Sequence, residues 1–199
     1  MNSELIRKDF PILETKVNGH PVVYFDNGAT TQRPLPVMRA VMDYVTRNNG
    51  NPHRGAHIFA MSASEAYDTS KTVVKDFIGA KSEKEIIYTR NTSESLNLVA
   101  RSYGETHLKE GDRILIPVSE HHSNLVPWQR AAKKTGAVLE YMYVDKETGH
   151  FPEEELKKID DPRVKILAFA QVSNVLGLSI DARALIRRAH KHGAVVVLD

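Results

Sequence analysis

Two adjacent histidines stand in a segment suited to proton transfer. His121 and His122 follow the apolar run RILIPV and precede a helical pattern, with Asn124 two residues further on. An imidazole gains and loses a proton near neutral pH. A histidine pair on the turn that leaves a strand is therefore a candidate for acid–base chemistry, provided that other polar groups converge there.

Polar residues also follow three other strand-like runs. Thr92 and Ser93 come shortly after EIIYT, Asn174 comes after VKILAFAQV, and Asp199 ends AVVVLD. Ligands of open α/β sheets bind at the carboxyl ends of the strands. The sequence therefore predicts that these side chains lie near the histidine pair.

Thr92 and Ser93 stand where a helix is predicted to begin. Free backbone N–H groups and the helix dipole suit such a place to a phosphate, and two hydroxyls add donors. Taken in isolation, the segment RNTSES favours plain helix capping. No GxGxxG or GxxxxGK[ST] motif occurs, so these loops give no support to nucleotide binding.

Asp199 and Asn174 offer two further kinds of polar contact. A carboxylate at the end of an apolar strand is partly desolvated and needs a positive partner, such as a protonated pyridine nitrogen, a lysine or a metal ion. A structural salt bridge would meet the same need. Asn174 suits a phenolic oxygen or a carboxylate, or it is a turn residue ahead of Gly177.

The segment HRGAH, residues 53–57, lies between two helical patterns. His53 and Arg54 could bind an anionic substrate, although a solvated loop explains them as well. His53 and His57 have the spacing of paired metal ligands, but no HExxH is present and the nearby proline and glycine oppose a helix there. We therefore predict no metal site.

The elements that must position these residues alternate along the chain. Ser62 with Glu65 has the spacing of a capping box, and Gly79, Gly136 and Gly193 stand where helices are expected to end. Apolar runs predict strands at 21–26, 85–89, 113–118, 137–144, 164–172 and 194–199. Helical patterns occupy 35–48, 64–79, 95–108, 125–136 and 182–193. This order predicts an α/β fold with three layers, α/β/α, around a mostly parallel sheet.

The composition excludes several classes of function. The 199 residues are 41% hydrophobic and 26% charged, with a net charge of +2 that is spread among acids and bases, so nucleic-acid binding is not expected. No apolar run is long enough to span a membrane, and the N-terminus lacks the apolar core of a signal peptide. The absence of cysteine excludes disulfides within these residues. A cytoplasmic location is expected.

The sequence predicts one domain with a short leading segment. Residues 1–20 form an N-terminal segment, and residues 21–199 form the front part of a large domain, because no linker divides them. The final run AVVVLD has the pattern of a buried parallel strand, which is normally followed by a loop and a helix. We therefore expect the domain to be incomplete at its C-terminus.

Together these motifs resemble those of the class V aminotransferase family, which uses pyridoxal 5′-phosphate (PLP). Within it the chain most resembles the group II, or SUF-type, cysteine desulfurases. EHHSN with the following PW is the most diagnostic. The motifs are YFDNGATTQRP (24–34), HRGAH (53–57), TRNTSESLNLVA (89–100), EHHSNLVPW (120–128), VSNVLG (172–177) and HKHGAVVVLD (190–199). The resemblance implies the large domain of the aspartate-aminotransferase-like fold.

The resemblance also implies a role for each candidate residue. His122 would stack on the PLP ring and move a proton at the substrate's α-carbon, with His121 as its supporting neighbour. Asp199 would pair with the pyridine nitrogen. The remaining roles would be phosphate binding by Thr92 and Ser93, contact with the phenolic oxygen and the substrate carboxylate by Asn174, and lining of the substrate end by Asn27, Gly28, Ala29, His53 and Arg54.

The implied activity is the conversion of L-cysteine to L-alanine, with sulfur passed through an enzyme persulfide to an acceptor protein of iron–sulfur cluster assembly. The implied parent is a homodimer. The family's Schiff-base lysine and its persulfide cysteine are expected beyond Asp199, so the fragment alone is expected to be inactive. Alternatives are a selenocysteine lyase, a kynureninase-like hydrolase, an epimerase, or a non-catalytic binding or structural fragment.

Overall fold

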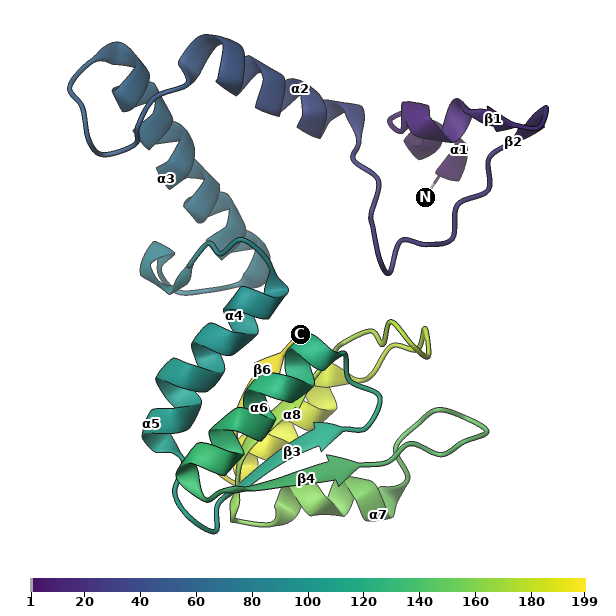
Figure 1. Cartoon of the computed structure of the whole chain (residues 1–199), viewed down its shortest axis with the longest axis vertical. Helices are drawn as coiled ribbons and strands as arrows, with labels where there is room; N and C mark the ends of the chain where they lie inside the picture. Colours follow the sequence, from purple (N-terminus) through teal and green to yellow (C-terminus); the bar gives the residue numbers. More distant parts are fainter. Residues whose placement is uncertain (1) are drawn as a thin grey trace. The chain divides into compact units, whose positions relative to one another are not determined.

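The computed structural model describes residues 2–199, which form two compact units (Figure 1). The first unit extends to Ile87 and the second covers Tyr88–Asp199. Each unit is described by itself below.

The first unit is mainly helical and has little core of its own. Among residues 2–87 the buried apolar residues are Ala60, Ala63 and Ile86. Its elements are α1 (Ser3–Arg7), the 3₁₀ turn η1 (Pro11–Glu14), the hairpin strands β1 (Lys16–Val17) and β2 (His20–Pro21), α2 (Leu35–Asp43), the π-helical turn η2 (Tyr44–Asn48), α3 (Ile58–Ile78) and the 3₁₀ turn η3 (Glu83–Glu85).

Two predicted strands are absent from the first unit. Of the segment 21–26, only Pro21 belongs to a strand, and Val23 and Phe25 are 72% and 93% exposed. The segment 85–89 holds the end of η3 and then extended chain. Both predictions were wrong because a strand requires a neighbouring strand to take up its N–H and C=O groups, and among the described residues neither 22–26 nor 85–89 pairs with one.

Helix α3 begins six residues before the predicted start. His57 is its N-cap, with Nδ1 accepting a hydrogen bond from the Ala60 N–H at 3.4 Å. The predicted capping box of Ser62 and Glu65 was wrong, because both residues lie inside the helix. The predicted end is confirmed, since Gly79 closes α3 with a left-handed φ of 73°.

The second unit is built around a four-stranded sheet. Its strands are β3 (Arg113–Pro117), β4 (Val138–Met142), β5 (Val164–Phe169) and β6 (Val195–Leu198). Its helices and turns are α4 (Thr92–Val99), η4 (Ala100–Gly104), α5 (Glu105–His107), α6 (His122–Thr135), α7 (Glu153–Leu156), η5 (Lys157–Asp160) and α8 (Ala182–Lys191).

The sheet is parallel throughout, with the order β4-β3-β5-β6. All four of its strands fall within the predicted runs, which are apolar because helices cover both faces. The predicted ends of two helices are also confirmed, with Gly136 and Gly193 at left-handed φ values of 76° and 78°.

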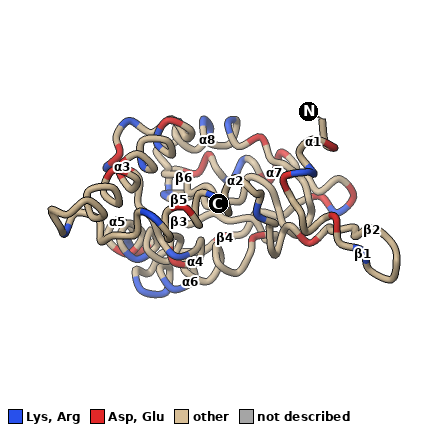
Figure 2. Tube along the Cα trace, turned by 90° about the horizontal axis from the view of Figure 1, so that it is seen from above, with Lys and Arg blue, Asp and Glu red and all other residues tan. Residues whose placement is uncertain are grey.

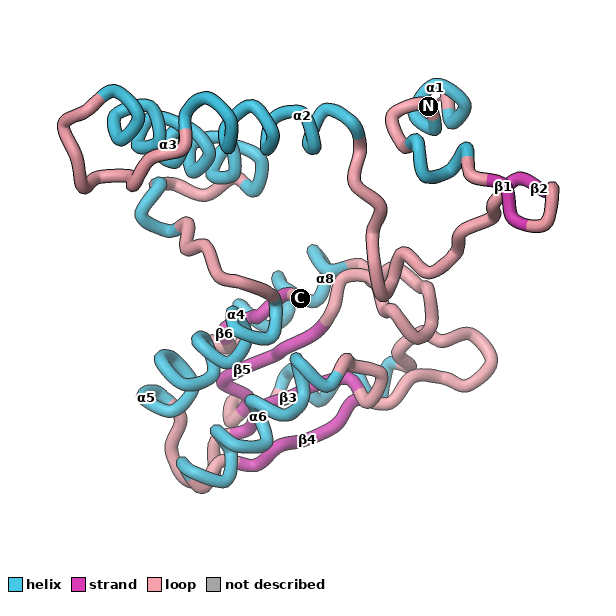
Figure 3. The backbone as a smooth tube through the Cα atoms, turned by 45° about the horizontal axis from the view of Figure 1, so that its top comes forward, coloured by secondary structure: helices cyan, strands magenta, loops and turns pink. Residues whose placement is uncertain are grey.

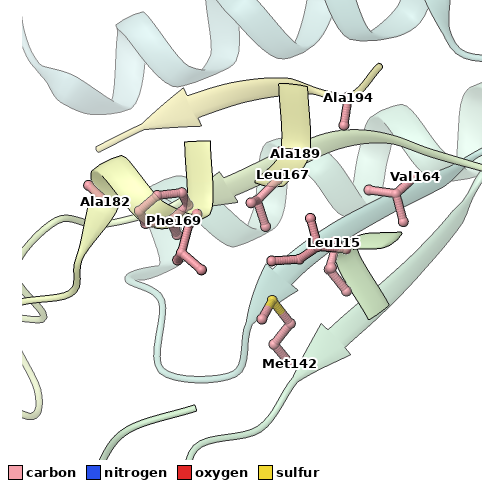
Figure 4. Packing of buried hydrophobic residues seen from close by; sticks show 10 residues of the cluster. Leu115, Met142, Val164, Leu167, Phe169, Ala182, Ala189 and Ala194 are labelled. Carbon is pink, nitrogen blue, oxygen red and sulfur yellow. The ribbon is translucent and has the colours of Figure 1, made fainter. Parts of the chain in front are cut away.

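Helices lie on both sides of the sheet (Figure 3), and two apolar clusters separate the sheet from them, one of which is shown in Figure 4. One face packs Leu115, Leu167 and Phe169 against α7, η5 and α8. The opposite face packs Ile114, Ile116 and Ile166 against α4, η4 and α6, where Trp128 is fully buried. The predicted three-layer α/β/α arrangement is therefore confirmed for this unit.

Charged residues of both signs are interspersed along the trace (Figure 2). Several form ion pairs at the amino-terminal ends of the strands, such as Arg113 with Glu140 at 2.6 Å and Arg163 with Asp161 at 2.7 Å. Across residues 2–199 no helix combines the length and the apolar character that crossing a bilayer requires.

Candidate active site

The order of the strands defines where a ligand is expected to bind. From β3 the chain passes through α6 to β4 on one side, and it then returns to β5 on the other side. The crevice at such a reversal, at the carboxyl ends of the strands, is the usual binding place in an open α/β sheet. Glu120 to His122, the segment 170–174 and Asp199 follow the carboxyl ends of β3, β5 and β6.

Asp199 is fixed by its main chain at the end of β6. Its N–H donates to the Phe169 carbonyl at 2.9 Å, and its carbonyl accepts from the Gln171 N–H at 3.1 Å. The residue as a whole is exposed, but partial desolvation at the strand end raises the pKa of its side-chain carboxyl, and the nearby His121 opposes that effect. A carboxylate in such surroundings is stabilised by a cation placed against it.

The histidine pair opens helix α6. His121 is the N-cap, and its Nδ1 accepts from the Ser123 N–H at 3.2 Å. His122 is the first helical residue, is exposed, and meets the edge of the His121 ring at a centroid distance of 6.1 Å. The structure therefore gives His121 a capping role and leaves the His122 ring accessible.

Thr92 and Ser93 occupy the first two positions of α4. The cap is supplied by Asn91, whose side-chain oxygen accepts from the Glu94 N–H at 2.9 Å. Both hydroxyl-bearing side chains are exposed and neither serves as the cap. Within this unit, the beginning of α4 lies beside the C-terminal end of β6 (Figures 1 and 3).

Asn174 lies in the loop after β5. Buried Ser173 builds the loop, because its hydroxyl accepts from the N–H groups of Val175 and Leu176 at 3.2 and 3.1 Å. Gly177, at a φ of 66°, completes the turn. Asn174 is exposed on this turn.

The remaining candidates belong to the first unit. Asn27, Gly28 and Ala29 form a turn in which the Ala29 N–H donates to the Asp26 carbonyl at 3.2 Å. All three are exposed.

HRGAH is irregular, as expected. His53 has a φ of 60°, and its ring lies 3.4 Å from the Asp68 carboxylate, while Arg54 is exposed. Among residues 2–199, no cluster of three or more His, Asp or Glu side chains is arranged to hold a metal ion.

A polar chain next to the histidine pair, partly buried at Glu120 and fully buried at Asn124 and Trp128, was not predicted from the sequence. Glu120 accepts from the Ala170 N–H at 2.9 Å and from the Asn124 side chain at 2.7 Å, and Asn124 accepts from the Trp128 indole at 3.0 Å. The available signal was the spacing Glu-x₃-Asn-x₃-Trp, which places Asn124 and Trp128 on one helix face and Glu120 just ahead of the N-cap.

Comparisons with known proteins agree with this arrangement. The model of the aminotransferase class-V family matches residues 23–199, so the chain belongs to that family. Its relatives include a probable cysteine desulfurase of Synechocystis sp., which is 45% identical over 98% of this chain and 46% of that protein. The chain thus spans about half the length of this relative.

Solved structures give the same result. The apo cysteine desulfurase of Thermococcus onnurineus superimposes with a TM-score of 0.88 at 41% identity, over 99% of this chain and 47% of that one. A cysteine desulfurase of Escherichia coli gives a TM-score of 0.82 at 34% identity, over 100% of this chain and 48% of that one.

Proposed function

We propose that this chain provides part of the active site of a PLP-dependent cysteine desulfurase. The observation that carries the proposal is the partly desolvated Asp199 carboxylate, held at the strand ends near the histidine pair in a chain 45% identical to a protein described as a probable cysteine desulfurase. Such a carboxylate suits a protonated pyridine nitrogen. The segment 21–199 would then be the front part of the PLP-binding domain.

The residues present fit the chemical groups of PLP. Asp199 would pair with the ring nitrogen, and the start of α4, with the hydroxyls of Thr92 and Ser93, would hold the phosphate. Asn174 would bind the phenolic oxygen, and the exposed ring of His122 would stack on the cofactor. When bound, PLP supplies an electron sink for the electrons of a breaking bond at the substrate's α-carbon.

The side chains of the protein would orient the substrate and move protons. His122 would exchange a proton with the substrate's α-carbon, a step suited to an imidazole at neutral pH. His121, fixed by its contact with Ser123, would support the neighbouring ring. Asn174 would orient the substrate carboxylate, and Asn27, Gly28, Ala29, His53 and Arg54 would line the substrate end.

The overall reaction would convert L-cysteine to L-alanine while an enzyme thiol becomes a persulfide. These 199 residues contain no cysteine, so that thiol is not among them. The persulfide would deliver sulfur to an acceptor protein of iron–sulfur cluster assembly. We further expect the enzyme to work as a homodimer in the cytoplasm.

The substitution His122→Ala in the desulfurase that contains this chain tests the proposal. Loss of a general acid–base group typically slows a reaction by about 10²–10⁴-fold, so alanine release from L-cysteine should fall by that order while PLP binding weakens but persists. The substitution Gln129→Ala, on the exposed side of α6, is the control. If His122→Ala slows alanine release by less than a few-fold, His122 has a packing role instead. Faster turnover of L-selenocysteine than of L-cysteine would favour a lyase instead.

A further inference from the structure

The Ala170 N–H lies at the end of the ladder between β3 and β5. The Phe169 carbonyl and the Gln171 N–H face Asp199, so the Ala170 N–H between them faces the opposite neighbour, β3. That strand ends at Pro117 and provides no further acceptor. The Glu120 carboxylate takes this place, with Oε1 2.9 Å from the Ala170 nitrogen.

The second oxygen of Glu120 ties the same point to helix α6. Oε2 accepts from Nδ2 of the fully buried Asn124, and Oδ1 of Asn124 accepts from Nε1 of Trp128. The indole N–H and the backbone N–H of Ala170 can donate a hydrogen bond but cannot accept one. The direction of every bond between these two ends is therefore fixed, and both oxygens of Glu120 must accept.

The electrostatic surroundings oppose the charge that this geometry requires. Burial raises the pKa of the Glu120 carboxyl and the charge of Asp199 adds to the effect, while the hydrogen bonds from Ala170 and Asn124 and the nearby His121 oppose it. A protonated Glu120 would direct an O–H at one of two N–H donors. The carboxylate thus stays in a partly buried position because both of its oxygens have donors.

From this geometry we infer that Glu120 is a positioning residue, which fixes the start of α6, and with it His122, against the end of β5 beside Asp199. Glu120 precedes His122 by two residues and Asn124 follows it by two, so the anchored side chains lie on both sides of the ring-bearing residue. Asp199 is fixed to the same end of β5 from the other side. The catalytic meaning of this contact rests on the proposed function, but the contact itself does not.

A donor–acceptor swap tests the inference in the full chain. In Glu120→Gln, the NH₂ group of the new side chain must point at either the Ala170 N–H or the NH₂ group of Asn124. Two donors then oppose each other. In Asn124→Asp, two carboxylates face each other. The double variant Glu120→Gln/Asn124→Asp restores every bond, since the amide at 120 donates to the carboxylate at 124, which also accepts from Trp128. Its net charge equals that of the original protein.

The chain contains a single tryptophan, so the indole N–H gives one resonance that reports on the swap directly. We expect each single variant to shift this resonance and to lower the unfolding midpoint. The double variant should recover most of both losses. Gln129→Glu, which adds a carboxylate to the exposed face of the same helix, should change neither. A double variant that fails to fold, or that is as perturbed as the two single variants combined, would overturn the directional chain.

The ring resonances of His122 test the positioning role. They should move in both single variants and return in the double variant. If the indole resonance recovers while the His122 resonances are the same in all variants, the chain is structural only and the positioning role is refuted. None of these measurements requires PLP or turnover, so failure of the proposed function leaves them unaffected.

Discussion

Asp199 and Asn174 differ in what they offer a bound ring, and the difference can be measured. Breaking a buried charge pair costs about 3–5 kcal/mol and an exposed one about 0–1 kcal/mol. Asp199 is expected to lie between these limits, because the residue is exposed while its carboxyl is partly desolvated. A neutral hydrogen bond, such as one from Asn174, contributes about 0.5–1.5 kcal/mol.

We therefore expect Asp199→Ala to weaken PLP binding by about 10- to 100-fold and Asn174→Ala by less than about tenfold, since about 1.4 kcal/mol corresponds to tenfold. Titration with PLP, followed by absorbance in the protein that contains this chain, measures both. Asp76→Ala, a substitution on the exposed surface of α3, is the control. Equal losses for the two site variants would argue against pairing of Asp199 with the ring nitrogen.

At the residue scale, the sequence identified the groups at strand ends but not their support. His122, Asn174 and Asp199 could be selected because each follows an apolar run. The role of Glu120 could not be predicted, because the carboxylate accepts a hydrogen bond from the Ala170 N–H, which is fifty residues away in the chain. A long-range contact of that kind depends on the order of the strands, which the apolar pattern alone does not specify.

At the scale of single elements, the cap of α4 allows a clean comparison within one helix. Asn91 accepts from the Glu94 N–H, whereas Asn97 lies inside the helix and donates to the Ser93 carbonyl at 2.8 Å. Asn91→Ala should lower the free energy of unfolding by about 1 kcal/mol. Asn97→Ala should leave it unchanged or raise it by a few tenths of a kcal/mol, because alanine favours helices.

Denaturant unfolding followed by Trp128 emission measures both variants, since the single tryptophan is buried in the same unit. The opposite order of stability would show that the Asn91 side chain does not cap the helix in solution.

All four strands of the sheet were predicted, and the two central ones show why. β3 and β5 are buried on both faces along most of their length, so a continuous apolar run was sufficient to find them. The segments 21–26 and 85–89 have similar residues but lie outside the four-stranded sheet. Local composition cannot distinguish these two situations, because a strand is defined by its neighbour.

At the scale of the whole molecule, ion pairs at the amino-terminal ends of the strands determine a response to acid. Hydrogen bonds from Arg163 lower the pKa of the Asp161 carboxyl from 3.8 to about 2. A pKa that is lower in the folded state adds stability that is complete above the unfolded value and is lost as the pH falls through the folded value. The contribution of Asp161 should therefore disappear between about pH 4 and about pH 2.

Arg163→Gln should raise the pKa of Asp161 and move this loss to higher pH. Unfolding midpoints measured across that range by Trp128 emission test the shift. Lys165→Gln is the control, because Lys165 donates to the Pro162 carbonyl at 2.7 Å and has no bond to Asp161. Identical acid profiles for the original protein and Arg163→Gln would exclude this ion pair as the cause.

The donor-only indole of Trp128 also limits the order in which this sequence can change during evolution. While Trp128 is present, Asn124 must direct its oxygen toward the indole, and an amide at position 120 is penalised. Replacing Trp128 first, by a residue without a donor, would allow Asn124 to turn over and position 120 to accept an amide. An amide at position 120 is therefore expected only together with an acceptor such as aspartate at position 124, or after Trp128 has been replaced, and the side chain that imposes this order lies eight residues from Glu120 and is linked to it through Asn124.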